Sequence, residues 1–297
     1  MPQSRLRPWL LLGGPLVVIA GLLLYPIFRV SVLSFQQYGL KEIISGKPRW
    51  IGLDNYREAL SGSFLWQTVL PNTVVFAVVV VLGTVVLGTL VALLLQSLGP
   101  RIRALVVGSA LVAWALPAVT GTYVWVWIFD PDSGVVRRLL GSMGLIGPDG
   151  FNWFTERLSF YAIVSANVIH HSYPFIAITV FAGLSTVPPE LHEAAKIDGA
   201  GAWRRFWSIT VPLMRPVFAV VTILSTIWDF KVFTQIYLMP GGDGSNPNVF
   251  NLGVWSYVTG INRTQYGMGS AIAVLLTILL LVITLIYLRM LFREEEL

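Results

Sequence analysis

The sequence predicts an all-α integral membrane protein with six transmembrane helices, and three observations support this fold class. Hydrophobic residues make up 55% of the 297 residues and charged residues only 12%, whereas a soluble domain carries about 25% charged residues. Six apolar stretches are long enough to cross a bilayer, which takes roughly 20 residues of helix. The 11 Trp and 10 Tyr residues suit a protein with two membrane interfaces, where amphipathic rings prefer to lie.

The predicted spans are the six long apolar stretches of the chain. They cover residues 9–34, 69–96, 104–129, 160–184, 213–239 and 269–290. The first follows Arg5 and Arg7 as a signal peptide would, but its apolar run is long and no A-x-A-type cleavage site follows, so we expect a retained helix. The connections are short and rich in turn-forming residues. We therefore expect one transmembrane domain over residues 1–297.

The orientation is predicted from Lys and Arg in the connections between spans. Nine basic residues lie in one set of connections and eight in the other. The two sets are 1–8, 97–103, 185–215 and 291–297 against 36–68, 130–159 and 240–268. Because the first set is shorter, its basic density is higher, and we expect both termini on the cytoplasmic side of a prokaryotic plasma membrane. The net charge of +5 follows from these flanking residues, so no nucleic-acid partner is expected.

The sequence lacks the motifs of several enzyme and metal-binding classes. It contains no G-x-x-x-x-G-K-[ST] loop for ATP, no Cys and no G-x-S-x-G elbow. The three histidines, His170, His171 and His192, have no carboxylate at metal-ligand spacing. We therefore expect no catalytic residue, no cofactor and no metal site, and a role in transport or anchoring.

The connection 185–212 is charged and interrupted by glycine. Pro188 and Pro189 end the fourth span and predict the start of a short helix over 190–198. Gly199 and Gly201 are expected to end this helix, and a second short helix carries basic and aromatic residues. The residues alone allow two interpretations of this helix–turn–helix elbow, an interfacial connector or a surface for a partner.

The elbow resembles the EAA signature E-A-A-x3-G-x9-I-x-L-P of ABC importer permeases. The matching residues are Glu193, Ala194, Ala195, Gly199, Ile209 and Pro212, with Val211 in place of the usual Leu. The resemblance implies a cytoplasmic coupling helix that docks onto a separate ATP-hydrolysing subunit. It implies that Glu193 is a polar contact and that Ala194, Ala195 and Gly199 allow close approach.

Further segments are similar to carbohydrate importers of the maltose-transporter type. Asp198 and Gly199 belong to their L-x-E-A-A-x-x-D-G-A form, Ile51 to Tyr56 resembles their G-L-x-N-Y segment, and Asn72-Thr73 and Phe233 to Asp243 also match. The chain lacks the extra N-terminal helices and large periplasmic insertion of the larger maltose permease subunit. The resemblance implies a type I ABC importer permease fold for a sugar. The implied partners are a second permease subunit, two copies of an ATP-binding subunit, an extracytoplasmic solute-binding protein and membrane lipid.

The fifth predicted span contains two ionisable residues, Asp229 and Lys231. Charges within a membrane are costly and usually face a cavity or a partner. At helical spacing Ser225, Asp229 and Val232 share one face, with Trp228 at its edge. Hydroxyl, carboxylate and indole groups suit a sugar, but they equally suit contacts between helices. Both interpretations stay open on the residues alone.

The resemblance to the maltose-type permease assigns the sugar contacts to six positions. These are Ser172, Phe175, Ser225, Trp228, Asp229 and Val232. Asp229 and Val232 stand where that permease has Asn, which indicates a sugar other than maltose. We expect Pro174 to loosen the fourth span and free backbone groups near the cavity. His170, His171 and Lys231 either line the same path or pack against neighbouring helices.

Three functions other than a sugar permease are alternatives for this sequence. A permease of the same class for a glycerol phosphate compound remains an alternative, although Asp229 argues against an anionic solute. A secondary transporter would need an inverted repeat and broken helices, and neither is evident in the sequence. A membrane enzyme or anchor would leave Asp229 and Lys231 unexplained.

Overall fold

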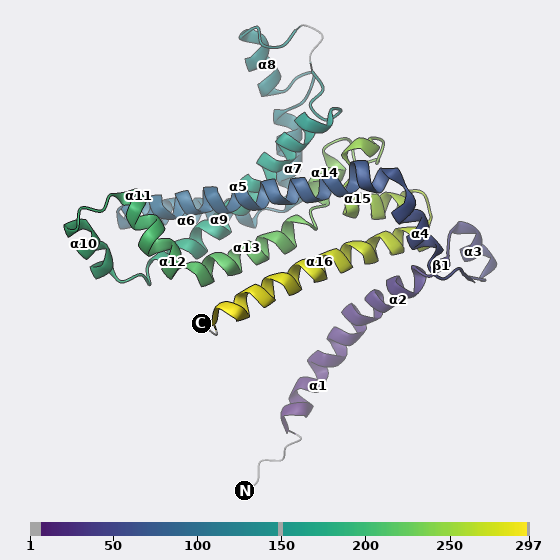
Figure 1. Cartoon of the computed structure of the whole chain (residues 1–297). Helices are drawn as coiled ribbons and strands as arrows, with labels where there is room; N and C mark the ends of the chain where they lie inside the picture. The colour runs from purple at the N-terminus through teal and green to yellow at the C-terminus, as the bar shows by residue number, and fades with distance from the viewer. Residues whose placement is uncertain (1–6, 148–150, 296–297) are drawn as a thin grey trace. The chain divides into compact units, whose positions relative to one another are not determined.

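The computed structural model describes residues 7–147 and 151–295, and this part of the chain is almost entirely helical (Figure 1). It divides into two compact units. One comprises the residues up to Gln67 together with Leu252–Leu279, and the other comprises Thr68–Asn251 together with the chain from Leu280 onward. The expectation of one domain over residues 1–297 stays a prediction.

The first span belongs to the first unit and is a long helix with a π-helical turn. It consists of α1 (Arg7–Ile19), the turn Ala20–Leu24 and α2 (Tyr25–Leu33). The apolar stretch Leu12–Leu33 has no buried residue. Apolar side chains exposed on all sides of a helix are expected where the solvent is lipid.

A short hairpin and two short helices follow the first span. Their bounds are β1 (Gln36–Gln37), α3 (Leu40–Ser45), β2 (Arg49–Trp50) and α4 (Asp54–Ser61). The strands pair antiparallel, with Gln36 opposite Trp50. Buried Asn55 donates from Nδ2 to the carbonyls of Ser34, at 2.9 Å, and Gln36, at 3.0 Å. The segment from Ile51 to Tyr56 therefore provides a hydrogen-bond donor for backbone carbonyls at the end of the first span.

The first unit is completed by the chain after Asn251. It contains α15 (Leu252–Tyr257), a π-helical turn (Val258–Asn262) and the first part of α16 (Tyr266–Glu295). The N–H of Gly267 donates to the carbonyl of Tyr38 at 2.9 Å. A Cβ at Gly267 would overlap the carbonyl oxygen of Gln36, so only glycine lets α16 begin against β1.

The second unit is built around two long helices that pack along one another, α5 (Leu70–Ser97) and α9 (Arg157–Leu184). Glycines on α5 allow the close approach. A Cβ at Gly88 would lie 2.7 Å from the side chain of Ile176 and 3.1 Å from the backbone nitrogen of Ala177. A Cβ at Gly83 would likewise overlap the side chain of Ile169. The remaining helices are α6 (Pro100–Ala115), α7 (Ala118–Ile128), α8 (Val135–Ser142), α10 (Pro189–Ile197), α11 (Ala202–Arg205), α12 (Val211–Leu213), α13 (Arg215–Asp229) and α14 (Thr234–Leu238).

The stretch expected as a third continuous span, 104–129, is broken. Helices α6 and α7 meet at a bend of 96°, with Leu116 extended and Pro117 at the start of α7. Proline has no N–H for a continuing helix and drives the preceding residue into the extended region. The described residues thus contain five helices long and apolar enough to span a membrane, or six when the bent pair counts as one.

The fifth span differs from the expected helix as well. Helix α13 ends at Asp229, the chain leaves helical geometry, and α14 begins at Thr234. The apolar stretch Arg215–Leu238 still has the length of a span. The helical face that contains Ser225 and Asp229 therefore ends at Asp229.

Replacement of Gly88 by Ala tests the packing of α5 on α9. The added methyl group overlaps Ile176 and the backbone of Ala177, so we expect a loss of about 1–3 kcal/mol and a lower melting temperature of the detergent-solubilised protein. Gly108→Ala on α6 is the matched control, because its Cβ would meet nothing within 4 Å. Equal melting temperatures for the two variants would contradict this packing.

Candidate functional site

Helix α10 ends in a glycine-dependent cap. The N–H of Gly199 donates to the carbonyl of Lys196 at 3.0 Å, and the N–H of Ala200 donates to that of Ala195 at 2.9 Å. Gly199 has φ +76°, a left-handed conformation that glycine adopts without strain. These two bonds form a Schellman motif. The sequence-based expectation that Gly199 ends this helix is confirmed.

A second set of contacts holds the two arms of the elbow together. The guanidinium group of Arg205 donates to the carbonyl of Ala200. The backbone N–H of Arg205 donates to the carbonyl of Gly201 at 3.0 Å. Gly201 is the N-cap of α11, with φ −64°. Gly201 thus begins the second arm and does not itself terminate the first. One arginine and two glycines fix the angle between α10 and α11.

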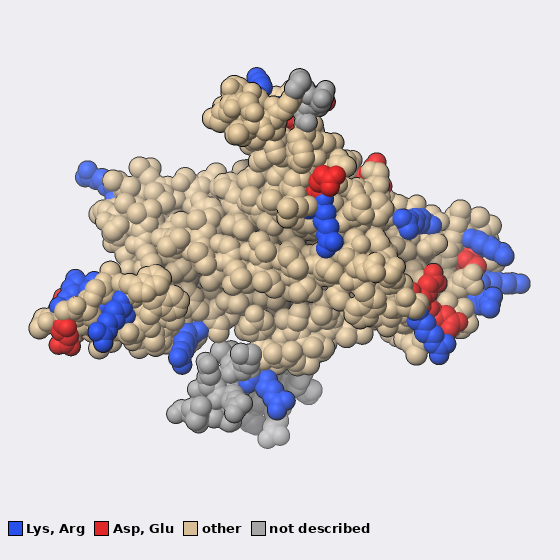
Figure 2. Space-filling view, turned by 45° about the horizontal axis from the view of Figure 1, so that its top comes forward, with Lys and Arg blue, Asp and Glu red and all other residues tan. Residues whose placement is uncertain are grey.

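The predicted coupling residues lie on the surface of this elbow. Glu193, Ala194, Asp198 and Gly199 are exposed, and Ala195 is half-buried. Ile197 is also exposed, at 87%, and adds apolar area to this surface. Basic and acidic side chains lie together over α10 and α11 at the left of Figure 2. The structure therefore presents a charged, partly apolar surface at the motif.

A groove separates α10 from the ends of α5 and α9. Its volume is about 560 Å³. It is lined by Leu93, Gln96, Leu184, Val187, Pro189, His192, Glu193, Lys196, Ala202, Arg205, Phe206 and Thr210.

Three aromatic rings from three helices meet within the second unit. The ring of Phe175 on α9 meets Trp228 on α13 edge to face, with centroids 5.1 Å apart, and stacks on Trp114 of α6 at 5.8 Å. Trp228 is 41% exposed and Trp114 is 38% exposed. Sequence reasoning identified Phe175 and Trp228 but missed Trp114, because nothing local indicates that residue 114 contacts residue 175.

A buried carboxylate lies next to this aromatic group in the chain. Asp229 is 2% exposed and Ser225 1% exposed, and Ser225 hydrogen-bonds the Asp229 side chain. The Oδ2 atom of Asp229 has no hydrogen-bond partner among the described residues. A buried polar atom without a partner is costly. Asp229 is therefore a candidate for binding a hydroxyl group from outside the chain.

The other two predicted sugar contacts are not joined to this group. Ser172 is half-buried on α9, and Val232 lies in the break after α13. The carbonyl of Val232 accepts a hydrogen bond from Nδ2 of Asn251 at 2.7 Å. The expected helical face of Ser225, Asp229 and Val232 is interrupted because α13 ends at Asp229.

The remaining polar candidates in this region differ in their surroundings. The His170 ring lies 6.1 Å from both Trp125 and Tyr173, measured between centroids. His171 is half-buried, and Lys231 is exposed in the break. No group of three or more metal-ligating side chains occurs among the described residues.

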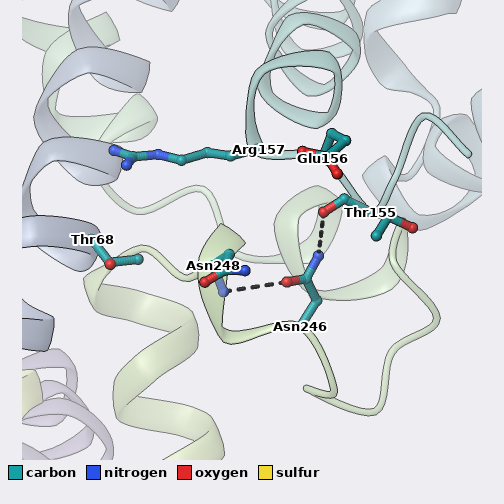
Figure 3. Close-up of a pocket in the computed structure, with 6 residues that line it drawn as sticks. All are labelled: Thr68, Thr155, Glu156, Arg157, Asn246 and Asn248. Atoms are coloured by element: carbon teal, nitrogen blue, oxygen red, sulfur yellow. Dashed lines mark hydrogen bonds between the residues drawn. The ribbon is translucent and has the colours of Figure 1, made fainter.

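A polar pocket that sequence reasoning did not identify lies near the start of α9 (Figure 3). Its volume is about 230 Å³, and it is lined by Thr68, Thr155, Glu156, Arg157, Asn246 and Asn248. Asn246 holds its walls together, donating to the Thr155 carbonyl at 3.0 Å and accepting from the Asn248 N–H at 3.3 Å. In the sequence this segment, SNPN at 245–248, indicates only a turn.

Apolar spans, an exposed charged elbow and a buried acid beside aromatic rings define a polytopic membrane transport subunit. Residues 84–294 match the family described as binding-protein-dependent transport system inner membrane component, and the chain belongs to this family. It is thus a component of a membrane transport system and not an enzyme. The resemblance to ABC importer permeases is confirmed.

The relatives that match most of the chain include two named for sugar transport. The diacetylchitobiose uptake system permease protein DasB of Streptomyces coelicolor is 39% identical, over 99% of this chain and 89% of its own. The trehalose/maltose transport system permease protein MalF of Thermococcus litoralis is 35% identical, over 83% of this chain and 81% of its own.

A solved structure supports the fold. A chain of a bacterial ABC transporter that imports the acidic polysaccharide alginate aligns with a TM-score of 0.81 and 22% identity, covering 97% of this chain and 96% of that one. The prediction of a type I ABC importer permease fold is confirmed.

The glycine cap of α10 is tested by trypsin, since Lys196, Arg204 and Arg205 provide cleavage sites in the elbow. Gly199→Val forces a β-branched residue to positive φ, which costs about 1–3 kcal/mol, so we expect the cap to open and cleavage to accelerate. Gly199→Asn is the control, because Asn tolerates the left-handed region. Cleavage at these sites is measured over time by mass spectrometry. Equal cleavage rates in the two variants would disprove the cap.

Proposed function

We propose that this chain is the permease subunit of an ATP-driven, binding-protein-dependent importer that moves a di- or oligosaccharide into the cytoplasm of a prokaryote. The observation that carries the proposal is the buried, partner-deficient carboxylate of Asp229, which directly follows the half-exposed Trp228 in the last turn of α13. An indole covers the apolar face of a sugar ring, and a carboxylate accepts its hydroxyl groups. The relatives named for diacetylchitobiose and trehalose/maltose transport support a sugar.

The proposed assembly contains a second, similar permease subunit, two copies of an ATP-binding subunit and an extracytoplasmic solute-binding protein. The family description itself names dependence on a binding protein. The sequence contains no P-loop motif, so ATP hydrolysis has to come from another chain. Both termini and the elbow lie in the cytoplasm in this proposal, where the basic residues are denser.

The elbow is proposed to receive the motion of the ATP-binding subunit. Glu193, Ala194, Ala195, Asp198 and Gly199 form its contact surface. Their exposure and the small size of the alanines and glycine favour close approach by a partner.

The proposed sugar site comprises Ser172, Phe175, Ser225, Trp228, Asp229 and Val232. Within it, Ser225 and Asp229 supply polar groups and the rings supply apolar surface. Val232 contributes only its side chain, since its carbonyl is engaged by Asn251. An anionic solute such as a glycerol phosphate compound is disfavoured by the carboxylate of Asp229.

Asp229→Asn tests the sugar site. The amide keeps the shape but removes the charged acceptor, so we expect uptake to fall about 10- to 100-fold, the effect of losing a hydrogen bond to a charged group, with assembly unchanged. Uptake of labelled diacetylchitobiose, trehalose and maltose is measured in proteoliposomes holding the complete assembly. Lys231→Gln is the control, because Lys231 is exposed two residues further on. Unchanged uptake by Asp229→Asn would contradict the site.

The coupling surface is tested by placing the same residue at two nearby glycines. Gly199→Asn keeps the cap but adds a side chain to the docking surface, so we expect stimulation of ATPase activity by the loaded binding protein to fall at least severalfold. Gly201→Asn is the control, because Asn is favourable at the N-cap of α11. Full stimulation in Gly199→Asn would argue against docking at this position.

A further inference from the structure

Phe175 lies between two tryptophans, and its own faces are largely occupied. Trp114 stacks on it with an angle of 25° between the ring planes, and Trp228 meets it at 66°. Phe175 also packs against a buried core cluster that includes Ala92, Ile176 and Val180. The phenyl ring is therefore supported from behind and covered on one face, and little of it is free for a ligand.

The free aromatic surface belongs to the two tryptophans. Trp114 is 38% exposed and Trp228 is 41% exposed. Each comes from a different helix, so Phe175 sets the spacing between two indoles that have open area. Half-exposed indoles separated by one supporting ring form a platform that can hold two consecutive sugar units, one on each indole.

Both tryptophans also occupy the last turn of a helix before a break. Trp114 lies one residue before the end of α6, and Trp228 lies one residue before the end of α13. The carbonyls of a terminal helical turn lack intrahelical donors, and Pro117 after α6 has no N–H to offer. Non-helical backbone at membrane depth is tolerated where it lines a cavity. At the end of α13 the carbonyls of Thr226, Trp228 and Asp229 already accept from the N–H groups of the residues that follow. Aromatic surface and terminal carbonyls without such donors therefore coincide only at Trp114, at the end of α6.

We propose that Trp114 contacts the transported sugar directly, with Phe175 positioned behind it and Trp228 as the second indole. This inference rests on the proposed sugar transport and narrows it, because two separated indoles select a substrate of at least two sugar rings over a monosaccharide. It adds a third helix, α6, to the site. In this proposal Trp114 of α6, and not Phe175 of α9, makes the main aromatic contact with the sugar.

The first test uses the absence of native cysteine in this chain. It is run on the complete reconstituted assembly with its loaded binding protein, and the label on this chain is measured. Trp114→Cys provides the chain's single thiol, and a water-soluble maleimide is expected to label it. Saturating diacetylchitobiose, trehalose or maltose is expected to slow labelling several-fold. Glucose is expected to leave the labelling rate unchanged. Ser133→Cys in the exposed loop after α7 is the control, with equal labelling in all conditions. Absence of labelling, or labelling unaffected by every sugar, overturns the contact.

The second test measures uptake kinetics. Trp114→Leu removes the ring and is expected to raise KM for the transported disaccharide about 3- to 10-fold, with Trp114→Phe intermediate. Trp127→Leu on α7 is the control, since Trp127 is 64% exposed and outside the ring group. Phe175→Leu is expected to raise KM as Trp114→Leu does, because the phenyl ring sets the spacing between the two indoles. Phe175→Tyr keeps a ring at this position and is expected to have the wild-type KM.

The outcomes separate this inference from the proposed function. If the wild-type assembly takes up none of the sugars, both are overturned. If it takes up a disaccharide and Asp229→Asn is defective while Trp114→Leu keeps the wild-type KM, only the Trp114 contact is overturned. If glucose competes as well as the disaccharides, the two-ring selection is overturned. Should Trp114→Leu fail to assemble, the Trp114→Phe kinetics and the Trp114→Cys labelling still decide the contact.

Discussion

Backbone groups inside a membrane have no water to bond, and this constraint shapes the whole chain. Helices satisfy their own N–H and C=O groups, so the structure is helical wherever it is apolar. At the ends of helices, asparagine side chains supply the missing partners. Four of them, Asn55, Asn72, Asn246 and Asn251, donate from Nδ2 to backbone carbonyls of segments distant in sequence. Apart from the short pair β1 and β2, the loops are thereby held by side-chain hydrogen bonds, and the sequence has no Cys for a disulfide.

The candidate site forms where the helical solution is interrupted. Helix α6 stops before Pro117 and α13 stops at Asp229. Each interruption places an indole in the last turn of a helix, and the end of α6 also leaves terminal carbonyls without helical donors. The same two features that make a break costly in lipid, open acceptors and an exposed edge, suit a hydroxyl-rich ligand with an apolar face.

The core of the second unit connects this site with the elbow. The buried cluster of Ala92, Ile176, Val180, Leu184, Met214 and Val221 contacts Phe175 at one side and Val187 at the other. Phe175 supports the indoles, and Val187 directly precedes the prolines that start α10. Because packed interiors transmit displacement instead of absorbing it, this cluster is a physical connection between the elbow, where we propose that a partner docks, and the proposed sugar site.

The sequence by itself determined the apolar spans, the elbow, the glycine cap at Gly199 and the family resemblance, because these depend on composition, spacing and local backbone chemistry. It also identified Asp229 and Trp228, since polar groups in an apolar stretch are visible without a partner. Only the tertiary structure decided that residues 104–129 bend by 96° and that the face shared by Ser225 and Asp229 ends before Val232. It alone brought Trp114 to Phe175, because contacts between residues far apart in sequence depend on how helices pack.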